Sequence, residues 1–472
     1  MTDSKKWSET LTYTKKSFYE RRESADFDKA LTYAKGYAAY LDASKTEREA
    51  VRESIRLAEQ KGFRPYHFGD KMQAGDKFYY NNRDKNLYLF TIGTESLENG
   101  IRICAAHIDS PRLDLKQCPL YEEGGMSFFK THYYGGIRKY QWVATPLSLH
   151  GVIVKTDGTR VDVCIGEDDS DPVFYINDLL PHLGHEQERK PMGEAIPGEK
   201  LNILVGSRPY EGEEKDAVKA QLVKLLKEKY GIEEEDFLSA EIEAVPADKA
   251  RDFGLDRSMI LGYGHDDRVC AYAELQAMLS LPAVPKYTAC CILTDKEEIG
   301  SVGATGMEAK FFENAVFELI QLCGGKACLG VRRALANSRM LSCDVSAGFD
   351  PMFADAFEKK NAAMLGRGVC YNKFTGARGK SGSNDANAEF IGRLRKVMDD
   401  HQVFFQTAEL GRVDLGGGGT IAYICALYGM EVIDSGVAAL SMHAPQEIIN
   451  KADLYEAVKA YEAFLKDMEP RN

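Results

Sequence analysis

Two adjacent glutamates, Glu297 and Glu298, follow an apolar run over residues 287–293 that is typical of a buried strand. Two carboxylates this close repel each other unless a cation or a proton relieves them. Adjacent residues at the end of a strand point to different sides, so one carboxylate can hold a metal while its neighbour handles a proton. The pair therefore favours a catalytic metal site over a purely structural role.

Other residues with metal-ligand chemistry also follow apolar runs, namely His107, Asp266, Asp344 and His443. Each is a weak signal alone: His107 is equally compatible with a strand end without a ligand, and Asp266 with a helix cap. Together, two histidines and several carboxylates at the strand ends of one sheet suit a dinuclear zinc-type site that activates water. Asp109 lies two residues after His107, so its carboxylate is expected to hydrogen-bond the His107 ring and fix its tautomer.

Composition limits the classes of partner. The chain has 472 residues, enough for two or three domains, with 44% hydrophobic residues. Lys and Arg total 60 against 72 Asp and Glu, and the net charge of −12 argues against nucleic acid or an anionic membrane as the main partner. The 11 cysteines include no Cys-x-x-Cys pair, and no apolar stretch approaches the ~20 residues of a membrane span. These features predict a cytoplasmic protein with reduced cysteines.

The apolar periodicity predicts an α/β fold in which helices flank a central mixed sheet. Helical spacing over residues 25–62 is followed by strands over 86–93 and 101–108. Further helices are predicted over 269–281, 309–322, 384–398, 420–428 and 454–465, alternating with strands over 287–293, 340–345, 403–407 and 431–436. This alternation places helices on both faces of the sheet and ligands at the strand ends.

Residues 115–255 differ in character and are predicted to form an inserted β-rich domain between two parts of a catalytic domain, 1–114 and 256–472. Short β-rich segments cover 142–149, 151–155, 160–165 and 240–245, and a charged helix is predicted over 211–230. Within the catalytic part, four glycines over 416–419 lack the Lys-Ser/Thr ending of a P-loop. We interpret this run, including Gly417 and Gly418, as a tight loop that lets backbone approach a substrate.

Several motifs resemble the aspartyl aminopeptidase family of dinuclear metallo-aminopeptidases, in family order and over nearly the whole chain. They include Ala-His-Ile-Asp-Ser-Pro-Arg-Leu-Asp (106–114), Tyr-Gly-Gly-Ile-Arg-Lys-Tyr-Gln-Trp (134–142), Asp-Leu-Leu-Pro-His-Leu (178–183), His-Asp-Asp-Arg-Val-Cys-Ala-Tyr (265–272), Asp-Lys-Glu-Glu-Ile-Gly-Ser (295–301), Cys-Asp-Val-Ser (343–346), Gly-Gly-Gly-Gly-Thr (416–420) and Met-His-Ala-Pro-Gln-Glu (442–447). The resemblance implies a zinc-peptidase-like catalytic domain that hydrolyses the N-terminal residue from small peptides with a free N-terminus.

The resemblance also implies the metal ligands. His107 and Asp344 would hold one ion, Glu298 and His443 the other, and Asp266 would bridge them. The ions would be zinc, with manganese or cobalt as possible substitutes. In these folds the peptide bond after the bridging aspartate is often a non-proline cis bond.

Further roles follow from the same resemblance. Glu297 would be the general base, and Asp109 would support the first ligand histidine. The inserted domain would mediate dimers that assemble into a tetrahedral dodecamer, with His182 or His185 reaching a neighbouring active site. An Asn-Gln-Arg-Tyr-Ala-Thr-like segment of family members with acidic specificity is replaced here by residues 379–387, where Lys380 either pairs with an acidic substrate side chain or is a solvated loop lysine.

Two alternative functions are compatible with these residues. A deacylase of N-acylated amino acids on the same fold would use the same ligands but would prefer a blocked amine. A catalytically silent assembly or cargo-binding protein is the alternative from another class, and the intact ligand set with Glu297 argues against it.

Overall fold

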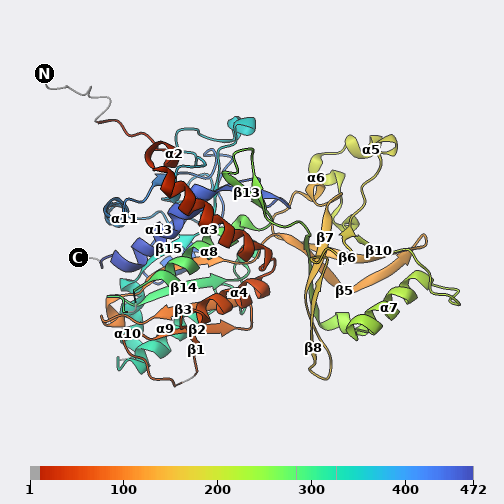
Figure 1. Ribbon diagram of the computed structural model, residues 1–472, viewed down its shortest axis with the longest axis horizontal. Helices are drawn as coiled ribbons and strands as arrows, with labels where there is room; N and C mark the ends of the chain where they lie inside the picture. Colours follow the sequence, from red (N-terminus) through yellow and green to blue (C-terminus); the bar gives the residue numbers. More distant parts are fainter. Residues whose placement is uncertain (1–10, 68, 283, 326, 471–472) are drawn as a thin grey trace.

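Apolar runs of the sequence form a nine-stranded sheet, the framework of the larger of two lobes (Figure 1). The computed structural model describes residues 11–67, 69–282, 284–325 and 327–470. In spatial order the strands are β1 (Arg64–Pro65), β2 (Lys77–Asn82), β3 (Asn86–Thr91), β14 (Ala289–Thr294), β4 (Arg102–His107), β15 (Arg339–Cys343), β19 (Glu431–Gly436), β17 (Val369–Asn372) and β18 (Phe405–Thr407).

The central strands β14, β4, β15 and β19 run parallel, so their carboxyl ends meet at one edge of the sheet. Thr294 at the end of β14 lies opposite His107 at the end of β4, and Cys343 of β15 lies opposite Ser435 of β19. This register brings the loops that follow the strands to one level, where a ligand site can form.

Helices cover both faces because alternate strand residues are apolar on both sides. Cys104 and Ala106 pack into one core cluster, while Ile103 and Ala105 pack into the cluster on the opposite face. The first face carries α3 (Ser24–Asp42), α4 (Glu47–Glu59), α8 (His265–Ser280), α11 (Ala388–Asp400) and α13 (Lys451–Asp467). The second carries α9 (Phe311–Leu322), α10 (Ala327–Asn337) and α12 (Ala422–Ala426), and the short α2 (Phe18–Arg21) packs near α3 and α13.

A five-stranded sheet continues the larger lobe. Its order is β12 (Arg251–Phe253), β13 (Met259–Gly262), β21 (Glu447–Asn450), β20 (Ala438–Leu440) and β16 (Ser346–Ala347). The turn between β20 and β21 contains His443, and β16 begins two residues after Asp344. This sheet therefore brings a ligand candidate from late in the chain to the carboxyl edge of the large sheet.

The smaller lobe, which we call the β-rich lobe, is a seven-stranded sheet within residues 112–246. Its strands are β11 (Ala240–Pro246), β5 (Arg112–Glu123), β6 (Met126–Tyr134), β10 (Ile203–Gly206), β9 (Phe174–Tyr175), β7 (Pro146–Val154) and β8 (Arg160–Ile165), and β11 also pairs with β7. Helix α7 (Ala217–Tyr230) packs on this sheet. The segment between β9 and β10, which we call the arm, carries α5 (His185–Glu188) and α6 (Met192–Ala195) and projects from the lobe (Figure 1).

The predicted α/β class is confirmed, and most predicted elements form near their expected bounds. Strand β7 is an exception, because it runs unbroken through Gly151 where separate segments were predicted. A Cβ at Gly151 would lie 1.9 Å from the backbone oxygen of Glu241 on β11. Glycine therefore allows β7 and β11 to approach each other closely at this position. Helix α7 begins at Ala217, later than expected. Helix α10 and several strands, among them β2, β5, β6 and β17, were not predicted.

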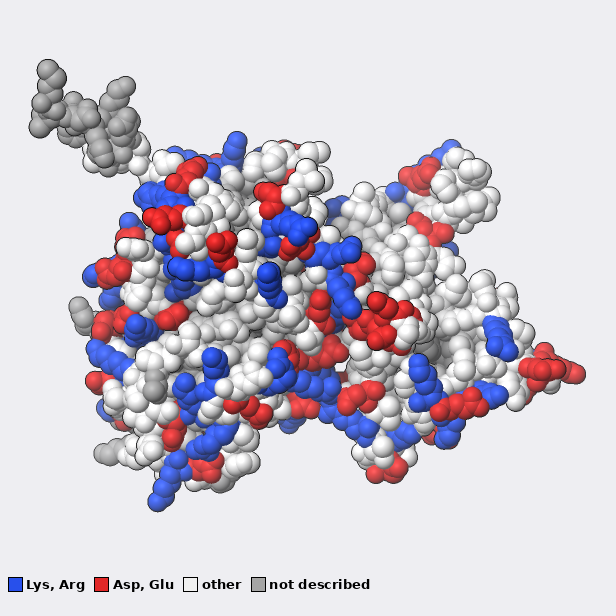
Figure 2. All heavy atoms as spheres, viewed as in Figure 1, with Lys and Arg blue, Asp and Glu red and all other residues white. Residues whose placement is uncertain are grey.

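Charge is not strongly segregated on the face of the molecule drawn in Figure 2, where acidic and basic side chains are interspersed. Among the described residues, no helix is both long and apolar enough to cross a bilayer. The cytoplasmic location stays a prediction.

Candidate metal centre

The predicted ligands come together at the carboxyl edge of the central strands. His107 ends β4, Asp344 follows β15, Asp266 lies in the first turn of α8, and His443 lies in the β20–β21 turn. The bond between Asp266 and Asp267 is cis, as the family resemblance implies. Four segments far apart in sequence thus place their side chains around one point.

The placement of Glu297 and Glu298 differs from the sequence-based expectation. Strand β14 ends at Thr294, and the two glutamates open a 3-10 turn over Glu297–Ile299. Lys296, just before the turn, has a positive φ of 69°, which redirects the chain after the strand. The different directions of the two carboxylates are therefore set by a turn, not by strand pleating.

Asp266 belongs to two ligand groups at once. One group contains His107, Asp266 and Asp344, and the other contains Asp266, Glu298 and His443, with the ligand atoms of each group within 4.8 Å of one another. Oδ1 of Asp266 lies 3.1 Å from Nε2 of His107, and Oδ2 lies 3.1 Å from Nε2 of His443. A carboxylate that turns one oxygen to each group has the arrangement needed to bridge two cations.

The excess of buried carboxylates in this cluster favours the binding of cations. Oε1 of Glu298 is buried without a hydrogen-bond partner, although it lies 3.6 Å from Nε2 of His443. Burial, opposed by His107 and reinforced by Asp344, Asp109 and Asp266, raises the pKa of Glu297 to about 8. Burial also raises the pKa of Glu298, and nearby Asp266 adds to the rise. Carboxylates crowded in this way are relieved by divalent ions, and histidine with carboxylate is a common zinc ligand set.

Asp109 supports the site in a way that differs from the prediction. The Nδ1 of His107 is 2.9 Å from the backbone oxygen of Asp109 and 3.4 Å from its carboxylate. The carboxylate also accepts hydrogen bonds from the backbone N–H groups of Glu297 and Glu298, at 3.1 and 3.2 Å. Asp109 therefore orients His107 mainly through its carbonyl and holds the glutamate turn through its side chain.

Glu447 makes an equivalent clamp that the sequence did not reveal. This buried carboxylate accepts the backbone N–H of His443 at 2.6 Å and that of Asp266 at 3.0 Å. Its place in the Met-His-Ala-Pro-Gln-Glu motif was the available signal. The motif gave no indication that its partner would be Asp266, 181 residues away in the chain.

A cavity of about 510 Å³ opens over the ligands. Gly417 and Gly418 line it, as predicted for a loop that approaches substrate, although their role in binding stays a prediction. Lys380 lies in an adjoining cavity of about 200 Å³ that shares Gly417 with the first. His182 and His185 are exposed on the arm and are not among the residues that line either cavity.

The cavity is acidic and contains two cation-ligand groups that share Asp266, with Glu297 as a further carboxylate beside them. This arrangement places the protein among the metal-dependent hydrolases. Residues 40–465 match the family described as aminopeptidase I zinc metalloprotease (M18). A probable M18 family aminopeptidase 1 of Clostridium acetobutylicum is 54% identical over 457 residues, covering 96% of this chain and 98% of the relative. The chain therefore belongs to the M18 family of zinc metallo-aminopeptidases, which confirms the resemblance found in the sequence.

Solved structures agree with this assignment. The crystal structure of an M18-family aminopeptidase from Thermotoga maritima matches with a TM-score of 0.92 and 44% identity, covering 96% of this chain and 100% of that chain. The structure of the S. cerevisiae mApe1 dodecamer has the same fold, with a TM-score of 0.76 and 20% identity over 92% of this chain and 97% of that chain.

Proposed function

We propose that the protein is a dinuclear aminopeptidase in which Glu297 is the general base. The observation that carries this proposal is the Asp266 carboxylate, which turns one oxygen to His107 and the other to His443. One ion would lie with His107 and Asp344, and the other with Glu298 and His443. The mixed histidine and carboxylate ligands favour zinc, with manganese or cobalt as possible substitutes.

The residues around the proposed ligands have different roles in hydrolysis. When bound, two divalent ions supply Lewis acidity and stabilise charge that develops on a peptide carbonyl. Glu297 lines the cavity beside both ligand groups, where its carboxylate can take a proton from water and deliver it to the leaving amine. Asp109 holds the backbone of Glu297, so the base keeps its position during proton transfer.

We propose a preference for peptides with an acidic first residue. The adjoining cavity is lined by Arg378, Lys380 and Arg412, with Glu409 as an opposing charge. The Nζ of Lys380 lies 3.2 Å from Asp385 and 4.1 Å from the centre of the Phe374 ring, so its ammonium group is held at this cavity. A predominantly basic cavity beside the metal ligands favours a carboxylate side chain.

We further propose that residues 115–255 mediate subunit contacts in a dodecamer, with His182 or His185 reaching a neighbouring site. The arm exposes Leu179, Leu180 and Leu183, with 48%, 51% and 66% of their surface accessible. Neighbouring apolar side chains left exposed in this way are typical of interaction surfaces. The dodecamer described for S. cerevisiae mApe1, which shares the fold, supports the same assembly.

Release of a chromophore from aminoacyl substrates tests the proposed activity. We expect zinc-dependent cleavage of free-amine substrates, fastest with an aspartyl or glutamyl residue, and little cleavage of their N-acetylated forms. Faster cleavage of the acetylated forms would support the deacylase instead. No cleavage by protein that contains metal would support the silent assembly protein.

A further inference from the structure

The end of strand β6 reaches from the β-rich lobe to the second ligand group. We call Tyr134, Gly135 and Gly136 the YGG segment. The backbone oxygen of Gly136 accepts a hydrogen bond from Nδ1 of His443 at 2.8 Å. This bond fixes the His443 ring with Nε2 toward Asp266 and Glu298, as a ligand histidine requires.

The glycines of this segment lie against the same ligands. A Cβ at Gly135 would be 3.3 Å from both Cβ and Oε2 of Glu298, and Gly135 has a positive φ of 74°. A Cβ at Gly136 would be 3.4 Å from Nδ1 of His443. Absence of side chains thus lets backbone from the β-rich lobe pack directly on Glu298 and His443.

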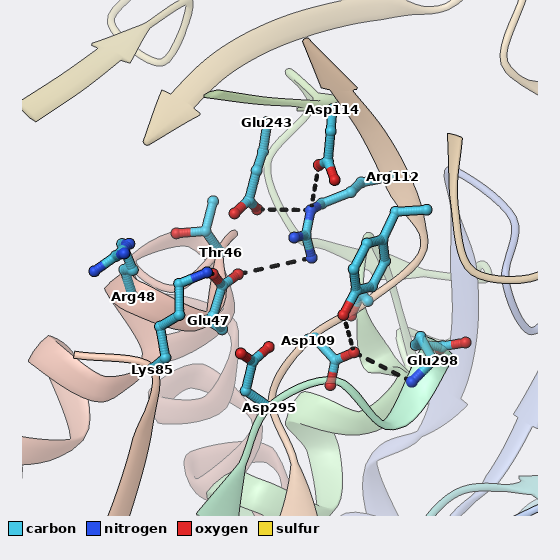
Figure 3. Close-up of polar contacts among 12 residues, drawn as sticks. Thr46, Glu47, Arg48, Lys85, Asp109, Arg112, Asp114, Glu243, Asp295 and Glu298 are labelled. Carbon is cyan, nitrogen blue, oxygen red and sulfur yellow. Dashed lines mark hydrogen bonds and ion pairs between the residues drawn. The ribbon is translucent and has the colours of Figure 1, made fainter. Parts of the chain in front are cut away.

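Tyr134 is linked to Glu298 through Asp109. Its hydroxyl donates a hydrogen bond of 2.8 Å to Oδ2 of Asp109, which also accepts the backbone N–H of Glu298. Figure 3 shows Asp109 and Glu298 joined in this way. Tyr134 therefore helps to keep the carboxylate of Asp109 in the orientation that supports the glutamate turn.

Buried charges fix Tyr134 in turn. The Arg112 guanidinium lies 3.8 Å from the centre of the tyrosine ring. Arg112 itself pairs with Asp114 and Glu243 of the β-rich lobe, at 2.8 and 3.1 Å, and with Glu47 of α4, at 3.7 Å (Figure 3). The position of the tyrosine is thus set at the junction between the lobes.

The first ligand group shares the support of Asp109 but is otherwise held from within the larger lobe. His107 is held by the carbonyl of Asp109, two residues away in the larger lobe, and Asp344 directly follows β15 of the central sheet. The YGG segment contacts Glu298 and His443, both members of the second group. The two groups therefore depend to different degrees on the β-rich lobe.

We propose that the YGG segment positions the ligands of the second ion, with Tyr134 as the positioning side chain, so that the β-rich lobe controls occupancy of that ion. The proposal rests on the proposed dinuclear function. In this proposal, the position of the β-rich lobe relative to the larger lobe determines whether the second ion is bound.

Zinc titration of metal-free full-length protein against a competing chelator tests this proposal. The variant is Tyr134→Phe, which removes the hydroxyl and keeps the ring. Tyr133→Phe is the matched control, because Tyr133 is adjacent and 43% exposed. Circular dichroism and melting temperature establish that both variants fold.

We expect wild type to bind two equivalents and Tyr134→Phe to bind one of them about 10- to 100-fold more weakly, the range typical for partners of metal ligands. The other equivalent should weaken by a smaller factor, because Tyr134 reaches His107 only through Asp109. Both equivalents of Tyr133→Phe should be unchanged. Unchanged affinities in Tyr134→Phe, or equal weakening of both equivalents, would overturn the proposal. A wild type that binds a single ion would overturn the dinuclear function itself and the proposal with it.

Discussion

Asp109 and Glu447 illustrate how single residues organise the site without being among the proposed ligands. Each buried carboxylate accepts backbone N–H groups from two residues of the cluster, Asp109 from Glu297 and Glu298, and Glu447 from Asp266 and His443. Hydrogen bonds to an ionised carboxylate are stronger than those between neutral groups. They fix the backbone from which the proposed ligands and base project.

Replacement of the proposed base should separate catalysis from metal binding. In Glu297→Gln we expect kcat to fall by about 10²- to 10⁴-fold, the usual contribution of a general base, because an amide cannot accept the proton. Metal content and melting temperature should change little, since Glu297 belongs to neither ligand group. Near-normal turnover, measured with metal content on the same sample, would refute the assignment.

The contribution of the Glu447 carboxylate to the free energy of unfolding can be tested with Glu447→Gln. Glutamine offers one acceptor oxygen, so one backbone N–H of His443 or Asp266 loses its partner in a buried setting. We expect the free energy of unfolding to fall by about 1–3 kcal/mol, the cost of a buried unsatisfied group. Denaturant unfolding beside Glu462→Gln, a less buried position on α13, provides the comparison. Equal stability of the two variants would argue against the clamp.

At the scale of elements, His150 joins strand β7 to helix α4. Its Nδ1 lies 2.7 Å from Glu49 of α4, and its Nε2 lies 3.1 Å from Glu167. Burial opposes protonation, but hydrogen bonds with Cys164, Glu167 and Glu49 outweigh it and raise the pKa of His150 to about 11. The protonated ring thus links the two lobes through flanking carboxylates.

This contact predicts a pH-dependent contribution to stability. The pKa of His150 is raised above the ordinary value of 6.5, so the contribution is fully present below that pH and is lost as pH rises toward about 11. We expect the melting temperature of wild type to exceed that of His150→Gln at about pH 6. This difference in melting temperature should shrink toward about pH 10. A difference that is constant across this range in differential scanning calorimetry would contradict the protonated link.

The sequence predicted elements better than the contacts between them. Strands β4, β14 and β15 were predictable because their apolar runs are continuous, and His107 and Asp344 were predictable because they end or follow such runs. Tyr134 and Glu447 could not be assigned roles, since their partners lie far away in the chain and come close only in the folded lobes. Strand β17 is too short for its periodicity to be distinctive.

At the scale of the whole molecule, we expect the exposed leucines of the arm to form a contact between subunits. In Leu180→Asp we expect a smaller assembly, because a charge in an apolar contact must be desolvated. Light scattering on size-exclusion chromatography measures the mass, and Leu329→Asp on α10, 53% exposed, is the control. If Leu180→Asp keeps the wild-type mass, the arm does not form the contact.

The central claim is that Asp266 is shared by two metal ions. Anomalous diffraction at the zinc edge, from crystals of the zinc-loaded protein, tests it most directly. The account predicts two peaks about 3.5–4 Å apart on either side of the Asp266 carboxylate, one beside His107 and Asp344 and the other beside Glu298 and His443. A single peak, or two peaks that do not share Asp266, would contradict it.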